Sequence, residues 1–211
     1  MNFPSTKPLI YLITEGEITS ANFAEKSFQT LEIIKKAVET EITLIQIREK
    51  QLSGKLLFEL SSKAAHITGN SNTKLLINDR ADIALAANVD GVHLTANSLS
   101  AEIIRADFPK DFIIGVSAHS LEKVLEAKKQ CANFVTFSPI FHSPNKGEPV
   151  GLGRLREICE KSGNFPVIAL GGIDETNYRE VLEIADGFAA IRFLNNAENL
   201  RSLFNAKKQK R

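Results

Sequence analysis

The sequence predicts an α/β protein folded as a single (β/α)8 barrel. Eight short apolar runs rich in branched residues recur along the 211 residues, and stretches with helical spacing separate them. Such alternation indicates parallel strands joined by crossover helices. Eight units favour a closed barrel, and a doubly wound sheet with extra edge elements is the alternative. No linker or low-complexity stretch divides the chain, so we expect one domain over residues 1–211.

The predicted strands are too short to be helices, and most of them are apolar almost throughout. This pattern is typical of parallel strands that are buried on both faces. The eight runs are Leu9–Thr14, Thr43–Ile47, Lys74–Ile77, Gly91–Leu94, Ile113–Val116, Phe134–Phe137, Val167–Leu170 and Gly187–Ile191.

The segments between these runs carry apolar residues at helical spacing, which predicts one apolar stripe on each helix. We expect loose tails over residues 1–8 and 205–211, because the ends of a domain are often poorly ordered. The predicted helices are Phe28–Val38, Leu56–Ile67, Ile83–Ala87, Leu99–Arg105, Leu121–Ala127, Leu152–Ile158, Tyr178–Ile184 and Glu198–Asn205.

Composition and charge limit the classes of function. The 26 basic and 25 acidic residues nearly cancel, whereas binding to nucleic acid calls for a basic excess. No apolar run approaches the roughly 20 residues of a spanning helix, and the N-terminal segment lacks the features of a secretory signal. Cys131 and Cys159 are not spaced like metal ligands. We therefore expect a cytoplasmic protein with reduced thiols that binds neither nucleic acid nor membranes.

The active site of such a barrel lies at the C-terminal ends of its strands. Gln46, Arg48 and Lys50 follow the second predicted strand, and alternation places them on one side, toward the barrel mouth. Two cations at the mouth favour an anion site, because they would be costly there without a counter-charge. The alternative is that Arg48 pairs with Glu49 or another carboxylate at the rim.

The residues after the third and sixth strands suggest a metal ligand and a lid. Asp79, which follows Asn78, can hold Mg²⁺ through oxygen, or it can cap the helix that begins near Ala81. The longest loop, residues 138–151, carries Lys146, and a lysine on such a loop can close over a charged substrate. The alternative is a plain mobile loop with a solvated lysine.

Three histidines receive different interpretations. His119 and Ser117 follow the fifth strand, where an imidazole and a hydroxyl can move a proton or bind phosphate. Ser120 is expected to cap the next helix. His93 lies within a strand and is interpreted as a hydrogen-bonded interior group, and His66 as a surface residue.

Gly171 and Gly172 follow the seventh strand. Glycines let backbone N–H groups approach a phosphate, and the loops after the seventh and eighth strands form the usual phosphate site of this fold. Together the candidates predict an enzyme for a phosphorylated small molecule. A step that uses a diphosphate and a metal is compatible with them.

Seven motifs occur in the order seen in the thiamine phosphate synthase and TenI family, and the chain resembles that family from Leu9 to Ile191. The motifs are QIREK at Gln46–Lys50, LLINDR at Leu75–Arg80, DGVHL at Asp90–Leu94, GVSAHS at Gly115–Ser120, FSPIFHSPNK at Phe137–Lys146, PVGL at Pro149–Leu152 and ALGGI at Ala169–Ile173.

The resemblance implies a TIM barrel that joins hydroxymethylpyrimidine diphosphate to a thiazole phosphate and releases pyrophosphate. It assigns Mg²⁺ to Asp79 and the pyrimidine to Gln46. It assigns the thiazole phosphate to Gly171, Gly172 and the backbone around Ile191. The residues implied to hold the diphosphate are Arg48, Lys50, Asn78, Ser117, Ser143 and Lys146, of which Ser117 and Lys146 are also expected to assist catalysis.

The chain departs from the synthases at two main positions. Ser98 stands where the second metal-binding aspartate is usual, and a hydroxyl is a poorer Mg²⁺ ligand than a carboxylate. Arg192 replaces a serine after the eighth strand, where it can contact the phosphate or block its site. Ser143 and Asn145 replace threonines that are common in the sixth loop.

Two alternatives to a synthase therefore stay open. One is a TenI-like thiazole tautomerase that uses His119 as its acid–base group and needs no metal or other cofactor. The other is a non-catalytic binder of thiamine intermediates. The resemblance also leads us to expect small phosphorylated substrates and a possible homodimer.

Overall fold

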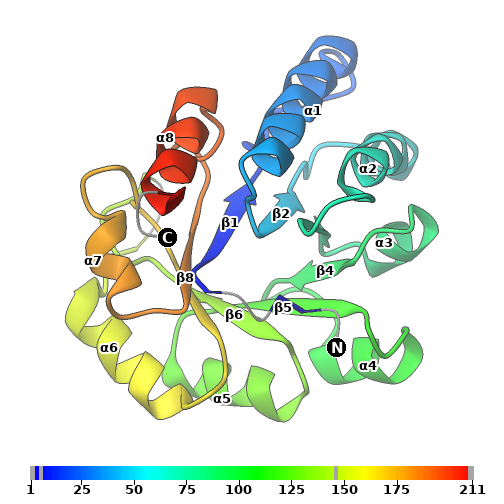
Figure 1. The fold of residues 1–211 in the computed structure, drawn as a ribbon. Helices are drawn as coiled ribbons and strands as arrows, with labels where there is room; N and C mark the ends of the chain where they lie inside the picture. The colour runs from blue at the N-terminus through cyan, green and yellow to red at the C-terminus, as the bar shows by residue number, and fades with distance from the viewer. Residues whose placement is uncertain (1–2, 5–6, 145–146, 209–211) are drawn as a thin grey trace.

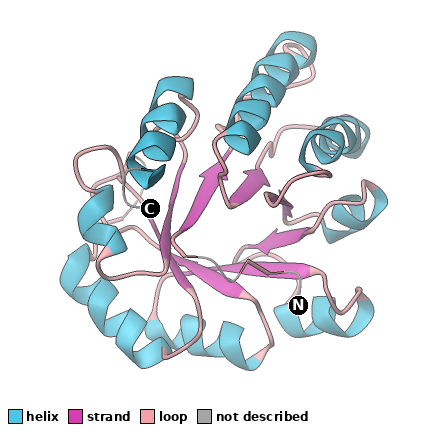
Figure 2. Ribbon diagram, viewed as in Figure 1, coloured by secondary structure: helices cyan, strands magenta, loops and turns pink. Residues whose placement is uncertain are grey.

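The computed structural model is a closed barrel of eight parallel strands surrounded by eight helices, as the sequence predicts (Figure 1). It describes residues 3–4, 7–144 and 147–208. The strands pair in chain order, and pairing of the first strand with the last closes the sheet. Figure 2 shows the strands at the centre with the helices around them.

Each predicted strand is confirmed, with ends that differ by at most two residues. The strands are β1 (Leu9–Ile13), β2 (Leu44–Ile47), β3 (Lys74–Asn78), β4 (Gly91–Leu94), β5 (Ile113–Ala118), β6 (Phe134–Phe137), β7 (Val167–Leu170) and β8 (Gly187–Ala190). Because β5 continues to Ala118, Ser117 lies within this strand and not after it.

The helices also follow the predicted order around the barrel. They are α1 (Phe23–Glu39), α2 (Gly54–Thr68), α3 (Ala81–Ala86), α4 (Ala101–Asp107), α5 (Leu121–Lys129), α6 (Gly151–Ser162), α7 (Tyr178–Leu182) and α8 (Ala197–Lys208). Helix α8 continues three residues past Asn205, into the segment expected to be a loose tail. Ser120 caps α5 as predicted, because its side chain accepts a hydrogen bond from Lys123 N.

Two apolar layers hold the barrel together. Successive residues of a strand face opposite sides of the sheet, so alternate residues fill the interior and the others pack under the helices. The interior cluster includes Leu9, Tyr11 and Phe134, which are all buried. Phe3 stacks on Phe134 with ring centroids 5.4 Å apart. Phe3 therefore packs on the core, although it belongs to the N-terminal segment that we expected to be loose.

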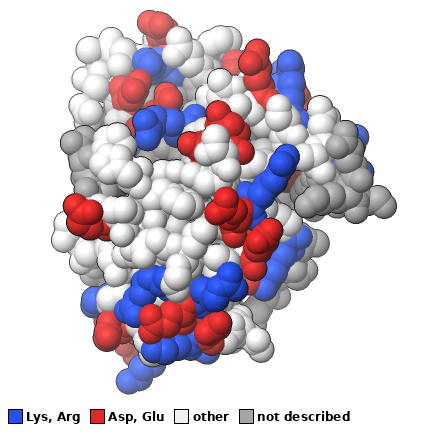
Figure 3. All heavy atoms as spheres, turned by 90° about the vertical axis from the view of Figure 1, so that its left-hand side faces the viewer, with Lys and Arg blue, Asp and Glu red and all other residues white. Residues whose placement is uncertain are grey.

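The surface carries mixed charge. In Figure 3, which shows the left-hand side of Figure 1, basic and acidic side chains are interspersed over the visible face. Neighbouring charges often pair along a helix; on α6, for example, Glu157 contacts both Arg154 and Lys161. None of the helices in the described part of the chain is long and apolar enough to span a bilayer.

Candidate active site

The C-terminal ends of the strands bring a set of polar side chains to the barrel interior. Gln46 lies on the same side of β2 as Leu44, and Asn78 on the same side of β3 as Leu76, both of which face the interior. Ser117 has the same inward register on β5. The barrel therefore gathers these three predicted residues at one end of its interior, above the apolar interior cluster.

A continuous hydrogen-bonded chain crosses this end of the barrel. Gln46 Nε2 donates to the Tyr11 hydroxyl at 2.8 Å, and that hydroxyl lies 3.2 Å from His93 Nδ1. His93 Nε2 lies 3.0 Å from Ser117 Oγ and 3.4 Å from Thr136 Oγ1. The interpretation of His93 as an interior hydrogen-bonded group is confirmed. Tyr11 and Thr136 are members that the sequence analysis missed, although both are polar residues at inward positions of apolar strands.

Burial fixes the protonation states of His93 and Tyr11 in this hydrogen-bonded chain. His93 and Tyr11 have almost no exposed surface. Burial, together with the positive charge of Arg48, lowers the pKa of His93 to about 3, so the imidazole is neutral at pH 7. Burial also raises the pKa of Tyr11 far above its ordinary value, so the phenol keeps its proton.

Gly115 makes room for the His93 ring. A Cβ atom at this position would lie 2.7 Å from His93 Nδ1 and 2.4 Å from the ring of Phe134. Any larger residue would therefore push either ring out of place. The glycine of the GVSAHS motif is thus part of the polar site, although it supplies no side chain.

Arg48 lies half-buried at the mouth, and Lys50 is exposed beyond it. The alternative in which Arg48 pairs with Glu49 is wrong. Glu49 is buried and accepts hydrogen bonds from Thr14 Oγ1 (2.6 Å), Gly16 N (3.1 Å) and Ile18 N (2.9 Å). No ion pair between described residues includes Arg48. Its charge is therefore available to an anion at the mouth.

Asp79 and Ser98, which follow β3 and β4, are in contact. Ser98 Oγ donates to Asp79 Oδ1, and Thr95 N donates to Ser98 Oγ at 2.7 Å. Asp79 does not cap α3, because Arg80 holds the N-cap position and no side chain makes the capping bond. The carboxylate instead faces the loop after β4, where the resemblance implies a metal.

This donor set fits Mg²⁺ only in part. Asp79 is one carboxylate hydrogen-bonded to the hydroxyl of Ser98, which in turn lies 3.2 Å from the hydroxyl of Thr95. No group of three or more His, Cys, Asp or Glu side chains suited to a metal gathers within the described ranges. Proteins commonly hold Mg²⁺ with one or two carboxylates and the phosphates of a substrate. The site therefore fits Mg²⁺ when a bound diphosphate supplies further oxygen ligands.

His119 is exposed at the end of β5 and is oriented by the next loop. Its Nδ1 lies 2.8 Å from the carbonyl oxygen of Ser138. A carbonyl only accepts, so Nδ1 carries the proton and Nε2 is the basic nitrogen of the neutral ring. Lys146 and Asn145 lie outside the described residues, and Ser143 is half-buried in the same loop.

Gly171 and Gly172 press the loop after β7 against the loop after β6. Both have positive φ angles, 105° and 63°. A Cβ atom on Gly172 would lie 2.4 Å from the carbonyl oxygen of His142, and one on Gly171 would lie 2.8 Å from Pro139 Cα. Phe141 N donates to Gly171 O at 3.0 Å. Only glycines allow this close approach, so part of their role is structural.

The same loops present backbone donors. No described residue accepts a hydrogen bond from the N–H groups of Gly172, Arg192 or Phe193. Asn195 joins the loop after β8 to β1, because its Nδ2 donates to Ile13 O (2.7 Å) and to Ile191 O (2.8 Å). Such unpaired N–H groups at the ends of β7 and β8 can bind a phosphate.

Arg192 is exposed at the edge of these donors. Hydrogen bonds from Thr176 lower the pKa of Asp174, and the charge of Arg192 lowers it further. Arg192 therefore lies near a carboxylate that offsets part of its charge.

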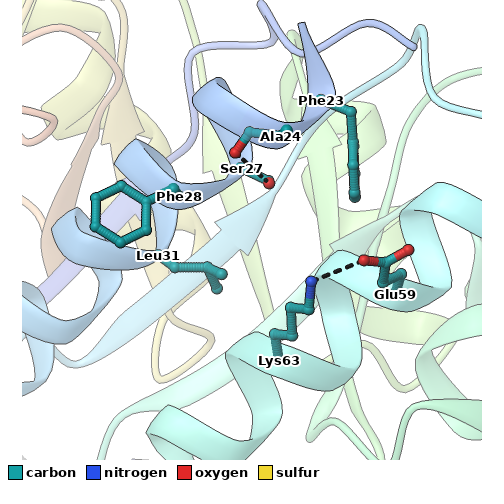
Figure 4. Close-up of a pocket in the computed structure, with 7 residues that line it drawn as sticks. All are labelled: Phe23, Ala24, Ser27, Phe28, Leu31, Glu59 and Lys63. Atoms are coloured by element: carbon teal, nitrogen blue, oxygen red, sulfur yellow. Dashed lines mark hydrogen bonds and ion pairs between the residues drawn. The ribbon is translucent and has the colours of Figure 1, made fainter.

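One hollow of the described structure lies away from these residues. It has a volume of about 330 Å³ and lies between α1 and α2 on the outside of the barrel (Figure 4). Phe23, Phe28 and Leu31 line it, together with the Glu59–Lys63 ion pair. It contains none of the predicted site residues, so we place the active site at the strand ends.

Comparison with known proteins agrees with this geometry. The model of the family described as thiamine monophosphate synthase matches residues 10–194. The chain belongs to this family. The match to the thiamine monophosphate synthase family begins in β1 and ends after β8, so it covers the whole barrel.

Individual relatives are similar over nearly the whole chain. A thiamine-phosphate synthase of Clostridium tetani is 34% identical over 195 residues, which are 91% of this chain and 90% of the relative. A thiamine-phosphate synthase of Clostridium acetobutylicum is 36% identical over 195 residues, 91% and 89% of the two chains. The solved structure of a thiamine phosphate pyrophosphorylase from Pyrococcus furiosus superposes with a TM-score of 0.77 at 30% identity and covers 93% of this chain and 95% of its own.

Proposed function

We propose that this chain is a thiamine-phosphate synthase, a transferase that joins hydroxymethylpyrimidine diphosphate to thiazole phosphate and releases pyrophosphate. One observation carries the proposal. Arg48, which has no carboxylate partner among the described residues, lies at the same barrel mouth as the inward-facing Gln46, Asn78 and Ser117. A member of this family with a cation beside polar side chains in the interior can hold a ring and its diphosphate together.

The reaction is a displacement at the methylene carbon of the pyrimidine. The bond from this carbon to the diphosphate oxygen breaks, and its electron pair leaves with the diphosphate. The lone pair of the thiazole nitrogen then forms the new carbon–nitrogen bond. No proton is gained or lost in this exchange, so the site mainly needs to stabilise the charge of the leaving group.

Different residues of the protein bind the diphosphate, the pyrimidine and the thiazole phosphate. Arg48, Asn78 and Ser117 donate hydrogen bonds to the departing diphosphate, with Lys50, Ser143 and Lys146 as further proposed contacts. Gln46 orients the pyrimidine in the interior. The backbone N–H groups of Gly172, Arg192 and Phe193 bind the phosphate of the thiazole and so direct its nitrogen toward the pyrimidine.

We propose Mg²⁺ as the cofactor, held by Asp79 with Ser98 beside it. When bound, Mg²⁺ offsets negative charge on the diphosphate. The single carboxylate supports a site that is completed by the substrate. Titration with Mn²⁺ as a spectroscopic probe is expected to give weak binding to the protein alone and clearly tighter binding with pyrophosphate. Equal affinity in both conditions would contradict this arrangement.

The direct test supplies both substrates and Mg²⁺ and measures thiamine phosphate. Wild-type protein is expected to form it, and Arg48→Ala is expected to lose most of the rate because each charged hydrogen bond contributes about 1.5–3 kcal/mol. Arg105→Ala is a control, because this arginine binds carbonyl groups near α4. No product from wild-type protein at high concentration would refute the synthase.

A thiazole tautomerase is the second candidate, supported by the basic Nε2 of His119 and by the missing second carboxylate at Ser98. Proton exchange on a thiazole carboxylate phosphate would be followed by NMR. Exchange that is lost in His119→Ala and kept in Asp79→Ala would favour the tautomerase. If neither reaction runs and thiazole phosphate still binds, the protein is a non-catalytic binder.

We also propose that the protein is cytoplasmic and forms a homodimer. Phe28 on α1 and Phe58 on α2 are 65% and 43% exposed, which makes this face the one to test for pairing. Light scattering of wild type and Phe28→Lys would show whether a dimer forms and whether it uses this face. A monomer at micromolar concentration would contradict the dimer.

A further inference from the structure

The hydrogen-bonded chain in the barrel links two parts of the proposed site. Its one end is Gln46, and its other end is Ser117. Between them lie the Tyr11 hydroxyl and the two nitrogens of His93, with separations of 2.8, 3.2 and 3.0 Å along the chain. Every link is a direct contact between described side chains.

A neutral histidine gives this chain a direction. One ring nitrogen donates and the other accepts, and the two possible tautomers exchange these roles. The Tyr11 hydroxyl has one proton, so it donates to one neighbour and accepts from the other. His93 is buried among neutral hydroxyl groups, which disfavours the doubly protonated form in which both nitrogens would donate. The chain therefore has two arrangements, which point in opposite directions.

In the first arrangement His93 carries its proton on Nε2. Ser117 Oγ accepts this proton's hydrogen bond, so its own O–H is directed to a ligand. His93 Nδ1 then accepts from Tyr11, and Tyr11 accepts from Gln46 Nε2. Gln46 is left with Oε1, an acceptor, for a ligand.

In the second arrangement every hydrogen bond is reversed. Ser117 donates to His93 Nε2 and offers a ligand only its lone pairs. Tyr11 accepts from His93 Nδ1 and donates to the amide oxygen of Gln46. Gln46 is then left with an NH₂ group for a ligand.

A phosphate oxygen can only accept from Ser117, so a bound diphosphate selects the first arrangement. We propose that His93 is a positioning residue whose tautomer couples anion binding at Ser117 to ring recognition at Gln46. The ligands named here rest on the proposed function. Because the selected arrangement leaves Gln46 as an acceptor, the occupied site takes a ring with an exocyclic amine and disfavours the corresponding oxo ring.

The histidine tautomer can be observed directly in the wild-type protein. Long-range ¹H–¹⁵N correlation spectra distinguish the two ring nitrogens, and His93→Gln identifies the signal among the four histidines. With saturating pyrophosphate we expect protonated Nε2 and bare Nδ1 on His93. Protonated Nδ1 in the bound state would overturn the coupling while leaving the proposed anion site intact. Absence of pyrophosphate binding would instead overturn the anion site of the proposed function, and the coupling with it.

Tyr11→Phe tests the link itself, because it removes one hydroxyl from the middle of the chain. The probe is 4-amino-2,5-dimethylpyrimidine, whose affinity is measured with and without pyrophosphate. In wild type we expect pyrophosphate to raise this affinity by about fivefold or more, the lower end of coupling between two sites. In Tyr11→Phe we expect the affinity for pyrophosphate to stay and the enhancement to vanish. Equal enhancement in both proteins would overturn the proposal, whereas a merely structural role of Tyr11 would lower both affinities and leave their ratio unchanged.

Discussion

Replacing Gly172 by alanine tests the packing of the loops that carry the proposed phosphate site. Gly172 has a φ angle of 63°, and a Cβ atom would lie 2.4 Å from the carbonyl oxygen of His142. The left-handed conformation costs an alanine about 1–2 kcal/mol. Displacing the opposed backbone costs about another 1–3 kcal/mol, as for other overpacked sites. We therefore expect Gly172→Ala to lower the free energy of unfolding by about 2–5 kcal/mol.

Two other glycines separate these contributions. Gly151 has a φ angle of 75° with no atom within 4 Å of an added Cβ, so Gly151→Ala reports the conformational cost alone, about 1–2 kcal/mol. Gly153 lies within α6, also with no atom near an added Cβ. Gly153→Ala is expected to stabilise the protein by about 0.5–1 kcal/mol through helix propensity.

Urea unfolding of the three variants measures these differences in the free energy of unfolding, and phosphate titration measures their affinity for phosphate. Gly172→Ala is expected to weaken phosphate binding about tenfold or more, because the loss of one charged hydrogen bond costs about 1.5–3 kcal/mol. The other two variants should bind phosphate as wild type does. If Gly172→Ala were no less stable than Gly151→Ala, the close contact with the loop after β6 would be refuted.

Three further predictions concern Ser98, Glu49 and His93. Ser98→Asp places a second carboxylate beside Asp79, so calorimetry should find tighter Mg²⁺ binding without pyrophosphate; unchanged affinity would contradict the metal position. Glu49→Ala leaves three donors without their acceptor and should lower the free energy of unfolding by about 3 kcal/mol or more. In urea unfolding, Glu49→Gln should be intermediate between wild type and Glu49→Ala. A loss below about 1 kcal/mol in Glu49→Ala would show that the loop after β1 is held by other contacts. The pKa of His93 in the folded protein is about 3, which is below its ordinary value of 6.5. Between these two pH values the unfolded chain therefore binds a proton that the folded protein excludes. Stability should therefore fall with decreasing pH across this window, by about 1 kcal/mol per pH unit, and His93→Gln should remove that slope in urea unfolding at pH 5 and 7; an identical slope in both proteins would refute it.

Local patterns were enough to predict the barrel. Each strand is a short buried run whose apolar character is fixed by the layers on both of its faces, so Leu9–Ile13 and Val167–Leu170 stand out without any knowledge of their neighbours. The ends of the strands were less certain, because they depend on pairing with neighbouring strands in the folded barrel. β5 continues through Ser117 because Ser117 pairs with Thr136 of β6, which the sequence around it does not reveal.

The site residues could be predicted by position and their partners could not. The rule that chemistry lies at strand ends led to Gln46, Asn78 and Ser117, and the barrel gathers them as expected. The alternative in which Arg48 pairs with Glu49 was wrong, because the N–H groups that hold Glu49 belong to a loop more than 30 residues away. The direction of the hydrogen-bonded chain through His93 depends equally on long-range contacts that no local pattern contains.

The most direct test of the proposed synthase activity is the stoichiometry of one reaction. Purified protein would be mixed with hydroxymethylpyrimidine diphosphate, thiazole phosphate and Mg²⁺, and the two products would be quantified together. We expect thiamine phosphate and pyrophosphate in equal amounts, formed only when both substrates are present. Neither product at high protein concentration, with both substrates shown to bind, would contradict this expectation.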